Sequence, residues 1–289
     1  MKKSRYVKDI VRFLLELEGL IDKYRIGNES NVISISDLKL LNIHGNEYVI
    51  FKYLDKVVKI HRRKFVDIDN LDEQNILSFI NLPTKRILMP TDALYDIDGR
   101  IKGYVMDFID NEKSLSNESM DHILNEARII EEDKKILDEK GILLQDLHEG
   151  NAMYNGKINI VDSGRYINTN VMLPTYMYLT DKTLMKSLKK SDLENLKEKV
   201  IKTNTLQVNY FIYRFLMNSI LDNSDDFEMY TYMSRVLEHF NEYTEKLKTT
   251  SFVDVMESEC SKDMTVEEYV KTLMKKVDTK YWEINTFIV

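Results

Sequence analysis

The stretch Gln145–Gly164, QDLHEGNAMYNGKINIVDSG, decides how this sequence is interpreted. Its middle is Asn155-Gly156, and Asn-Gly between two short apolar runs is the strongest short-range signal for a β-hairpin. The runs are AMY before the turn and KINIV after it. The hairpin therefore brings Asn151, just before its first strand, close to Asp162, just after its second strand.

Three oxygen-bearing side chains gather around this predicted hairpin. Asn151 and Asp162 offer amide and carboxylate oxygens, which suit Mg²⁺ and leave other coordination positions for phosphates. Asp146 lies on the loop that leads into the hairpin, where a carboxylate can orient an attacking hydroxyl or accept its proton. The alternative is that all three residues only form turns, as Asp and Asn often do.

The sequence before this stretch has the pattern of a small β-rich part. Between residues 36 and 62, three strand-like runs are separated by HGNE and DK, which predicts three antiparallel strands. Residues 71–80 have a helical pattern. Asp98-Gly99 joins two further strand-like runs.

The sequence after Asp110 is mainly helical in its pattern. Ser119 is placed to cap a helix, and Gly141 is placed to end it in the left-handed conformation. Leu206–Leu221 is apolar almost all round, which predicts a buried central helix. The sequence therefore predicts an α+β fold with a helical N-terminal extension over residues 1–30, a β-rich part over 31–110 and a helical part over 111–289.

The motifs of the opening stretch resemble those of a known superfamily. DLHEGN at Asp146–Asn151, followed by DSG at Asp162–Gly164, resembles the catalytic loop and the metal-binding motif of the protein kinase-like superfamily. The D-x-H-x-x-N form is similar to that of aminoglycoside and choline kinases and of atypical bacterial kinases. The resemblance implies a bilobal fold, with a small β-rich N-lobe and a larger helical C-lobe. It also implies that Asp146 is the catalytic aspartate and that Asn151 and Asp162 bind Mg²⁺.

A strand upstream carries the same resemblance. Val57-Val58-Lys59-Ile60 resembles the V-A-I-K strand of kinases, and strand alternation places Val57 and Lys59 on one face. The resemblance implies that Val57 packs on adenine and that Lys59 binds the α- and β-phosphates of ATP. It also implies that Glu73, on the following helix, holds Lys59 extended. The alternative for Lys59 is a solvated strand lysine.

Gly103–Asp110, GYVMDFID, resembles the segment that links the two kinase lobes. By this resemblance, Met106 lines the adenine pocket, and backbone groups of Asp107, Phe108 and Ile109 bond the purine. The whole set implies an ATP- and Mg²⁺-dependent phosphotransferase that binds ATP between its lobes.

Some kinase features are missing. The loop that covers the phosphates in kinases is rich in glycine, whereas this sequence has Gly45 alone in IHGNEY. His148 stands where serine/threonine kinases have a lysine that helps to neutralise the transferred phosphoryl group. Ser163 replaces the phenylalanine that follows the metal-binding aspartate.

Composition and charge restrict the partners. The 289 residues are 43% hydrophobic and 31% charged, with a formal net charge of −7. A diffuse acidic balance argues against binding of nucleic acid through its phosphates. No apolar run is long enough to span a membrane, and the N-terminus has the pattern of an amphipathic helix. Cys260 is the only cysteine, which excludes an intramolecular disulfide and suits the cytoplasm.

The acceptor is the open question. A protein Ser or Thr hydroxyl is the first expectation, because residues 165–205 resemble no dedicated small-molecule pocket. A small hydroxylated or cationic metabolite, such as an aminoglycoside, is the second. A third possibility is a pseudokinase scaffold, suggested by the single Gly45 in the phosphate-covering loop.

Overall fold

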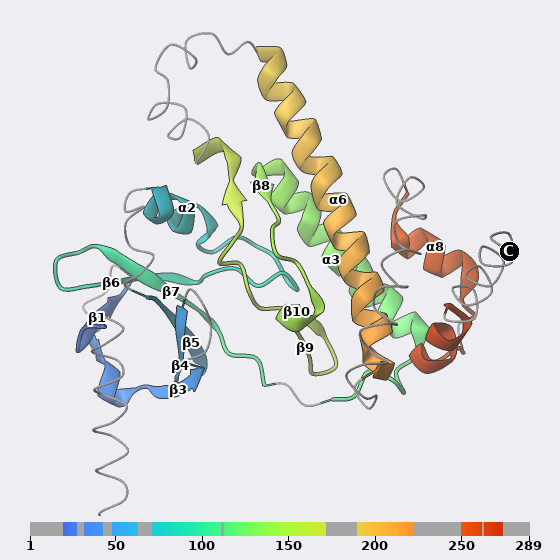
Figure 1. Cartoon of the computed structure of the whole chain (residues 1–289), viewed down its shortest axis with the longest axis horizontal. Helices are drawn as coiled ribbons and strands as arrows, with labels where there is room; N and C mark the ends of the chain where they lie inside the picture. Colours follow the sequence, from blue (N-terminus) through green and yellow to red (C-terminus); the bar gives the residue numbers. More distant parts are fainter. Residues whose placement is uncertain are drawn as a thin grey trace, which may run out of the picture. The chain divides into compact units, whose positions relative to one another are not determined.

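The computed structural model describes residues 20–27, 32–42, 48–62, 71–110, 113–171, 190–221, 250–261 and 263–273. In these residues the chain has an α+β fold, with a curled antiparallel sheet in its N-terminal part and a helical C-terminal part (Figure 1). The chain divides into two compact units. The first contains Met1–Leu82, Leu88–Phe108 and Asn168–Lys186, and the second contains Pro83–Ile87, Ile109–Ile167 and Ser187–Val289.

The first unit is built on a seven-stranded sheet with the order β2-β1-β6-β7-β5-β4-β3. The predicted strands of residues 36–62 are confirmed, and so is the strand pair joined at Asp98-Gly99, where Gly99 has a φ of +81°. The elements are β1 (Lys23–Ile26), β2 (Val32–Ser34), η1 (Ile35–Asp37), β3 (Lys39–Asn42), β4 (Tyr48–Tyr53), β5 (Lys56–His61), α2 (Leu71–Phe79), β6 (Asp92–Tyr95) and β7 (Ile101–Asp107).

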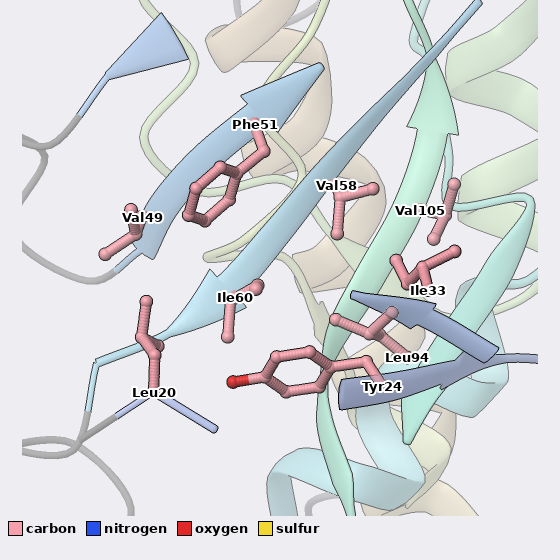
Figure 2. Close-up of a cluster of buried hydrophobic side chains, with 9 residues drawn as sticks. All are labelled: Leu20, Tyr24, Ile33, Val49, Phe51, Val58, Ile60, Leu94 and Val105. Atoms are coloured by element: carbon pink, nitrogen blue, oxygen red, sulfur yellow. The ribbon is translucent and has the colours of Figure 1, made fainter. Parts of the chain in front are cut away.

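One face of this sheet carries the hydrophobic core of the unit (Figure 2). The register pairs Phe51 of β4 with Val58 of β5, and Val49 with Ile60, so their side chains share this face. The cluster also includes Leu20, Tyr24, Ile33, Leu94 and Val105. Burying each large apolar side chain stabilises the fold by about 1.5–3 kcal/mol. Because side chains alternate along β5, this core leaves Val57 and Lys59 on the opposite face.

The predicted helical extension over residues 1–30 is wrong in its last part. Residues 23–26 form β1, which pairs with β2 and, through Ile26 and Leu94, with β6. Tyr24 is 2% exposed, and its hydroxyl accepts a hydrogen bond from the N–H of Ile21 at 3.0 Å. Pairing with a strand far along the sequence, together with burial of Tyr24, overrides the local helical pattern. Residues 1–19 lie outside the described residues.

Gly103 allows β5 and β7 to approach each other closely. The register pairs Gly103 with Ile60, next to Lys59. A Cβ atom at Gly103 would lie 1.9 Å from the carbonyl oxygen of Lys59 and 3.1 Å from the Cα of Ile60. Both neighbours are backbone atoms of the strand that carries Lys59, so a side chain at residue 103 requires that strand to move.

Gly103→Ala is therefore expected to lower the free energy of unfolding by about 1–3 kcal/mol or more, as overpacked sites do. Urea unfolding followed by circular dichroism measures the change. Gly99→Ala is the matched control, because Gly99 also has a positive φ but no atom within 4 Å of its Cβ position. Equal destabilisation by the two substitutions would contradict the close approach.

The second unit is mainly helical. Its predicted α3 cap is confirmed, because the N–H of His122 donates to Ser119 Oγ at 3.3 Å and Gly141 has a φ of +69° after the helix. Residues 266–273 form a further helix, whose start has reciprocal bonds between Thr265 and Glu268. The elements are α3 (Met120–Glu139), β8 (Ile142–Leu143), η3 (Glu149–Asn151), β9 (Ala152–Tyr154), β10 (Ile158–Ile160), α6 (Lys190–Leu221) and α8 (Phe252–Glu259). The two-residue strand β11 (Ile167–Asn168) has its first residue in the second unit and its second residue in the first unit.

The predicted buried helix over Leu206–Leu221 is confirmed as the second half of α6. Phe211, Leu216 and Met217 are fully buried, and Val208 and Ile212 are 1% exposed. Among the described residues, no helix is both long enough and apolar enough to cross a membrane.

Buried carboxylates of α3 hold two other segments of the second unit. Asp133, 1% exposed, accepts hydrogen bonds from the backbone N–H groups of Lys85, Arg86 and Ile87 at 2.5–2.9 Å. Glu126 binds the Arg86 guanidinium through two bonds of 2.5 and 2.9 Å and accepts the N–H of Ile158 at 3.0 Å. Burial of Glu126 opposes its ionisation, but Arg86 and the Ile158 N–H outweigh it and lower its pKa. The β9–β10 hairpin is thus anchored to α3 (Figure 1).

Candidate functional site

The loop between β8 and η3 places Asp146 in an unusual backbone conformation. Its φ is +58°, in the left-handed region that Asp and Asn occupy more readily than other residues with a side chain. The side-chain amide of Asn151 donates to the carbonyl oxygen of Asp146 at 3.0 Å. This bond closes the loop over the turn η3 and fixes the distance between the two residues. Strained backbone of this kind is concentrated at functional sites.

The predicted hairpin is confirmed and brings the third residue of the set close. β9 and β10 are antiparallel, with Gly156 in the turn at a φ of +97°. At the open end of the hairpin, the N–H of Val161 donates to the carbonyl of Asn151 at 2.9 Å. Asp162 follows directly, and its Oδ1 accepts the N–H of Gly164 at 3.1 Å. Asn151 and Asp162 therefore lie at the same end of one hairpin.

Tyr166, four residues after Asp162, is buried and senses the charge of both carboxylates. Its side chain is 1% exposed. Burial raises the pKa of the Tyr166 phenol, and the negative charges of Asp162 and Asp146 raise it further. The bonds from the Asn151 side chain to the Asp146 carbonyl and from the Val161 N–H to the Asn151 carbonyl link the three residues. The second unit therefore brings Asp146, Asn151 and Asp162 together, while their roles stay predictions.

Two nitrogen-bearing side chains flank the Asp146 carboxylate. His148 Nε2 lies 3.8 Å from Oδ1, and Arg165 Nε lies 3.4 Å from Oδ2. The N–H of Gly150 donates to His148 Nδ1 at 3.1 Å, so the neutral ring carries its proton on Nε2, toward Asp146. The Asp146 side chain is 41% exposed and therefore accessible from solvent.

The side chains at the hairpin end fit a hard cation. Because the nitrogen of the Asn151 amide bonds Asp146, its oxygen points away from that carbonyl as an acceptor. The Asp162 carboxylate is oriented by Gly164, and a carboxylate accepts several partners at once. No cluster of three or more His, Cys, Asp or Glu residues suited to a metal occurs among the described residues. A cation here would therefore depend on one carboxylate, one amide and ligands supplied by a substrate.

A buried asparagine on α6 supports the start of the loop that carries Asp146. Asn204 is fully buried, and its Oδ1 accepts the N–H of Leu144, two residues before Asp146, at 2.8 Å. Its Nδ2 donates to Asp138 Oδ1 at 2.7 Å and to the carbonyl of Ile142 at 2.8 Å. Asn204 thus ties the end of α3, the strand β8 and the start of the loop to one helix.

Asn204→Ala is expected to destabilise the protein by about 2–4 kcal/mol, because it leaves several buried polar groups unsatisfied at about 1–3 kcal/mol each. Urea unfolding measures this loss. Thr203→Ala, at an exposed position of the same helix, is the control and should change stability by less than about 0.5 kcal/mol. An Asn204→Ala protein as stable as the control would show that this network does not hold the loop.

An ion pair with α6 also holds the turn η3. The Glu149 carboxylate pairs with the guanidinium of Arg214 on α6, with side chains 17% and 23% exposed. Arg214 also donates to the hydroxyl of Tyr210 at 3.3 Å. The turn that carries Asn151 is therefore held at both ends of the loop.

In the first unit, Lys59 is buried on the sheet face opposite the core. Lys59 is only 5% exposed, so the alternative of a solvated strand lysine is wrong. The amine lies 5.9 and 5.6 Å from the ring centroids of Tyr48 and Tyr104. Val57 lies on the same face, and its partner in the register is Met106, which is 1% exposed. Val57, Lys59 and Met106 are therefore neighbours on this face of the sheet, while their roles stay predictions.

One backbone group of the segment predicted to bond a purine already has a hydrogen-bond partner within the protein. The N–H of Phe108 donates to the carbonyl of Asp55 at 2.9 Å, so a purine would use other backbone groups near Asp107 and Ile109. The Asp107 carboxylate binds Lys56 at 2.6 Å, and this bond raises the Lys56 pKa. Lys52 Nζ lies 3.5 Å from the Phe108 ring centroid.

Glu73 has a partner that the sequence did not predict. Its Oε1 accepts the backbone N–H of Ile101 at 3.0 Å, which joins α2 to β7. Its pairing with Lys59 stays a prediction. Gly45 and the rest of residues 43–47 lie outside the described residues.

Sequence reasoning missed Arg165, Tyr166 and Asn204. Arg165 and Tyr166 directly follow the predicted DSG motif, and this adjacency was a usable signal. Asn204 lies just before the apolar stretch of α6. Nothing in the sequence around a single asparagine in a helix indicates that it is buried. Its role depends on contacts 60–66 residues away in the sequence.

The comparisons with known proteins give no family. No protein-family model matches the sequence, and no curated protein matches it at a significant level. The case for a function therefore rests on the side chains and their contacts.

Proposed function

We propose that this protein is an ATP- and Mg²⁺-dependent phosphotransferase with a bilobal, protein kinase-like fold. The observation that carries the proposal is the loop of the second unit. Asn151 is bonded to the Asp146 carbonyl, and the hairpin places Asp162 beside Asn151. Kinase-like catalysis depends mainly on positioning and on charge neutralisation, and a loop closed by these bonds supports the positioning.

The first unit supports the nucleotide half of the proposal. Lys59 is buried with its amine near two aromatic rings, on a face that it shares with Val57 and Met106. Lys59 would bind the α- and β-phosphates of ATP, with Val57 and Met106 against the adenine.

The second unit supports the chemical half. Asn151 and Asp162 would hold Mg²⁺, which neutralises charge on the β- and γ-phosphates when bound. Asp146 would orient the acceptor hydroxyl and take its proton as the γ-phosphoryl group is transferred. The half-exposed Asp146 carboxylate is reachable for this purpose.

A protein Ser or Thr hydroxyl is the acceptor that we propose first. Arg165 lies 3.4 Å from Asp146, and its positive charge opposes the approach of a cationic metabolite to that carboxylate. A small hydroxylated acceptor is the second class. The two classes differ in where labelled phosphate appears.

The proposal is tested with γ-labelled ATP, Mg²⁺ and the purified protein, alone and with cell lysate. Label should enter protein with the wild-type protein, and it should not with Asp146→Asn. Label in a small molecule instead would change the acceptor class. Calorimetric binding of Mg-ATP without any turnover would identify a pseudokinase scaffold, and the absence of both binding and turnover would overturn the proposal.

A further inference from the structure

Arg165 contacts the proposed catalytic aspartate from a different segment of the chain. Its Nε lies 3.4 Å from Asp146 Oδ2, and the two side chains are 51% and 41% exposed. His148 Nε2 is on the other carboxylate oxygen, at 3.8 Å. The carboxylate thus has a nitrogen-bearing neighbour on each side, and the nearer one is the guanidinium.

The turn that presents Asp162 also sets the direction of Arg165. The N–H of Gly164 bonds Asp162 Oδ1, and the N–H of Tyr166 bonds the carbonyl of Ser163, both at 3.1 Å. Ser163 and Tyr166 are buried, at 2% and 1% exposed, whereas Arg165 lies at the surface between them. Its backbone is therefore fixed on both sides. Arg165 therefore connects the Asp162 turn to the Asp146 carboxylate.

The two flanking side chains differ in the charge that they can supply. An Arg guanidinium keeps its positive charge at any working pH, and its planar N–H groups match a carboxylate. An imidazole is uncharged in one of its two protonation states. His148 is oriented by Gly150 and directs an N–H toward Asp146, but 3.8 Å is too long for a hydrogen bond.

We propose that Arg165 is a positioning residue that holds the Asp146 carboxylate toward the acceptor hydroxyl and supplies the fixed positive charge that the D-x-H loop lacks. This inference rests on the proposed phosphotransferase function. Arg165 acts through Asp146 and links its orientation to the turn that carries Asp162. A displacement of about 1 Å at such a group lowers the rate by up to about 100-fold.

The test compares kinetic constants of Arg165→Met and Arg165→Lys with those of the wild-type protein. Arg165→Met should lower kcat by about 10- to 100-fold and leave the KM for ATP unchanged, because the residue acts on the acceptor side. Arg165→Lys should recover part of kcat, since it keeps the charge but not the planar guanidinium. Arg128→Met is the matched control, because Arg128 pairs with Glu257 at similar exposure on other elements and should leave kcat unchanged.

Added guanidinium ion, at a concentration that does not unfold the protein, gives the second readout. It should restore kcat in Arg165→Ala and have no effect on Asp146→Asn. If the wild-type protein transfers phosphate and Arg165→Met has the same kcat, the inference is overturned and the proposed function is left intact. Loss of activity that neither lysine nor guanidinium restores would show a structural role, and so would also overturn it. Absence of transfer by the wild-type protein would overturn both proposals.

Discussion

Asp146→Asn is expected to reduce phosphoryl transfer by about 10²–10⁴-fold while Mg-ATP binding and stability stay close to those of the wild-type protein. The substitution removes the negative charge that, in the proposed function, orients the acceptor hydroxyl and takes its proton. It leaves the bond from the Asn151 side chain intact, because that bond goes to the backbone carbonyl of residue 146. Single-turnover rates with labelled ATP, and titration calorimetry with Mg-ATP, measure the two quantities separately.

The choice of asparagine follows from the backbone. Residue 146 has a φ of +58°, which asparagine adopts nearly as readily as aspartate. Alanine in this conformation costs about 1–2 kcal/mol, so Asp146→Ala would mix a chemical effect with strain in the loop. Asp121→Asn, at an exposed position in the first turn of α3, is the control for a changed carboxylate. Full activity of Asp146→Asn would exclude Asp146 as the catalytic residue.

The elements that the sequence predicted correctly are those set by neighbouring residues. The Asn155-Gly156 turn, the cap at Ser119 and the left-handed Gly141 each depend on the conformational preferences of a few adjacent residues. The hairpin in turn placed Asn151 and Asp162 together, because its two strands have equal length and a fixed register. For this reason the local part of the candidate site could be predicted.

The parts that the sequence did not predict depend on contacts between distant residues. The strand β1 forms because it pairs with β2 and β6, although the sequence predicted a helical extension over this range. Asn204 lies on α6, about 60 residues after the loop that it supports. Asp133 holds residues 85–87 by accepting hydrogen bonds from their three backbone N–H groups. Such contacts have no local signature, since they arise only when elements pack together. The partner of Glu73 at Ile101 is a further example.

Asp162→Asn is expected to remove the part of nucleotide affinity that depends on Mg²⁺. Asparagine keeps the Oδ1 atom that accepts the Gly164 N–H, so the turn and the position of Arg165 should be retained. It removes the negative charge that a hard divalent cation requires in a site with only one other proposed protein ligand, the amide of Asn151. Removal of an outer-shell partner of a metal lowers the metal affinity by about 10–100-fold. Loss of a direct ligand at Asp162 should lower the Mg²⁺ affinity by at least this factor.

Calorimetric titration with ATP, with and without Mg²⁺, separates the roles of the two aspartates. In the wild-type protein and in Asp146→Asn, Mg²⁺ should increase the affinity for ATP. In Asp162→Asn, the affinities with and without Mg²⁺ should converge, while Lys59 still contributes to the Mg²⁺-independent part. If Asp162→Asn kept the increase and Asp146→Asn lost it, the metal ligand and the hydroxyl-orienting residue would have to be exchanged. A cation held by Asp146 would then stand beside the Arg165 guanidinium, and this like-charge contact is the physical reason for assigning the metal to Asp162.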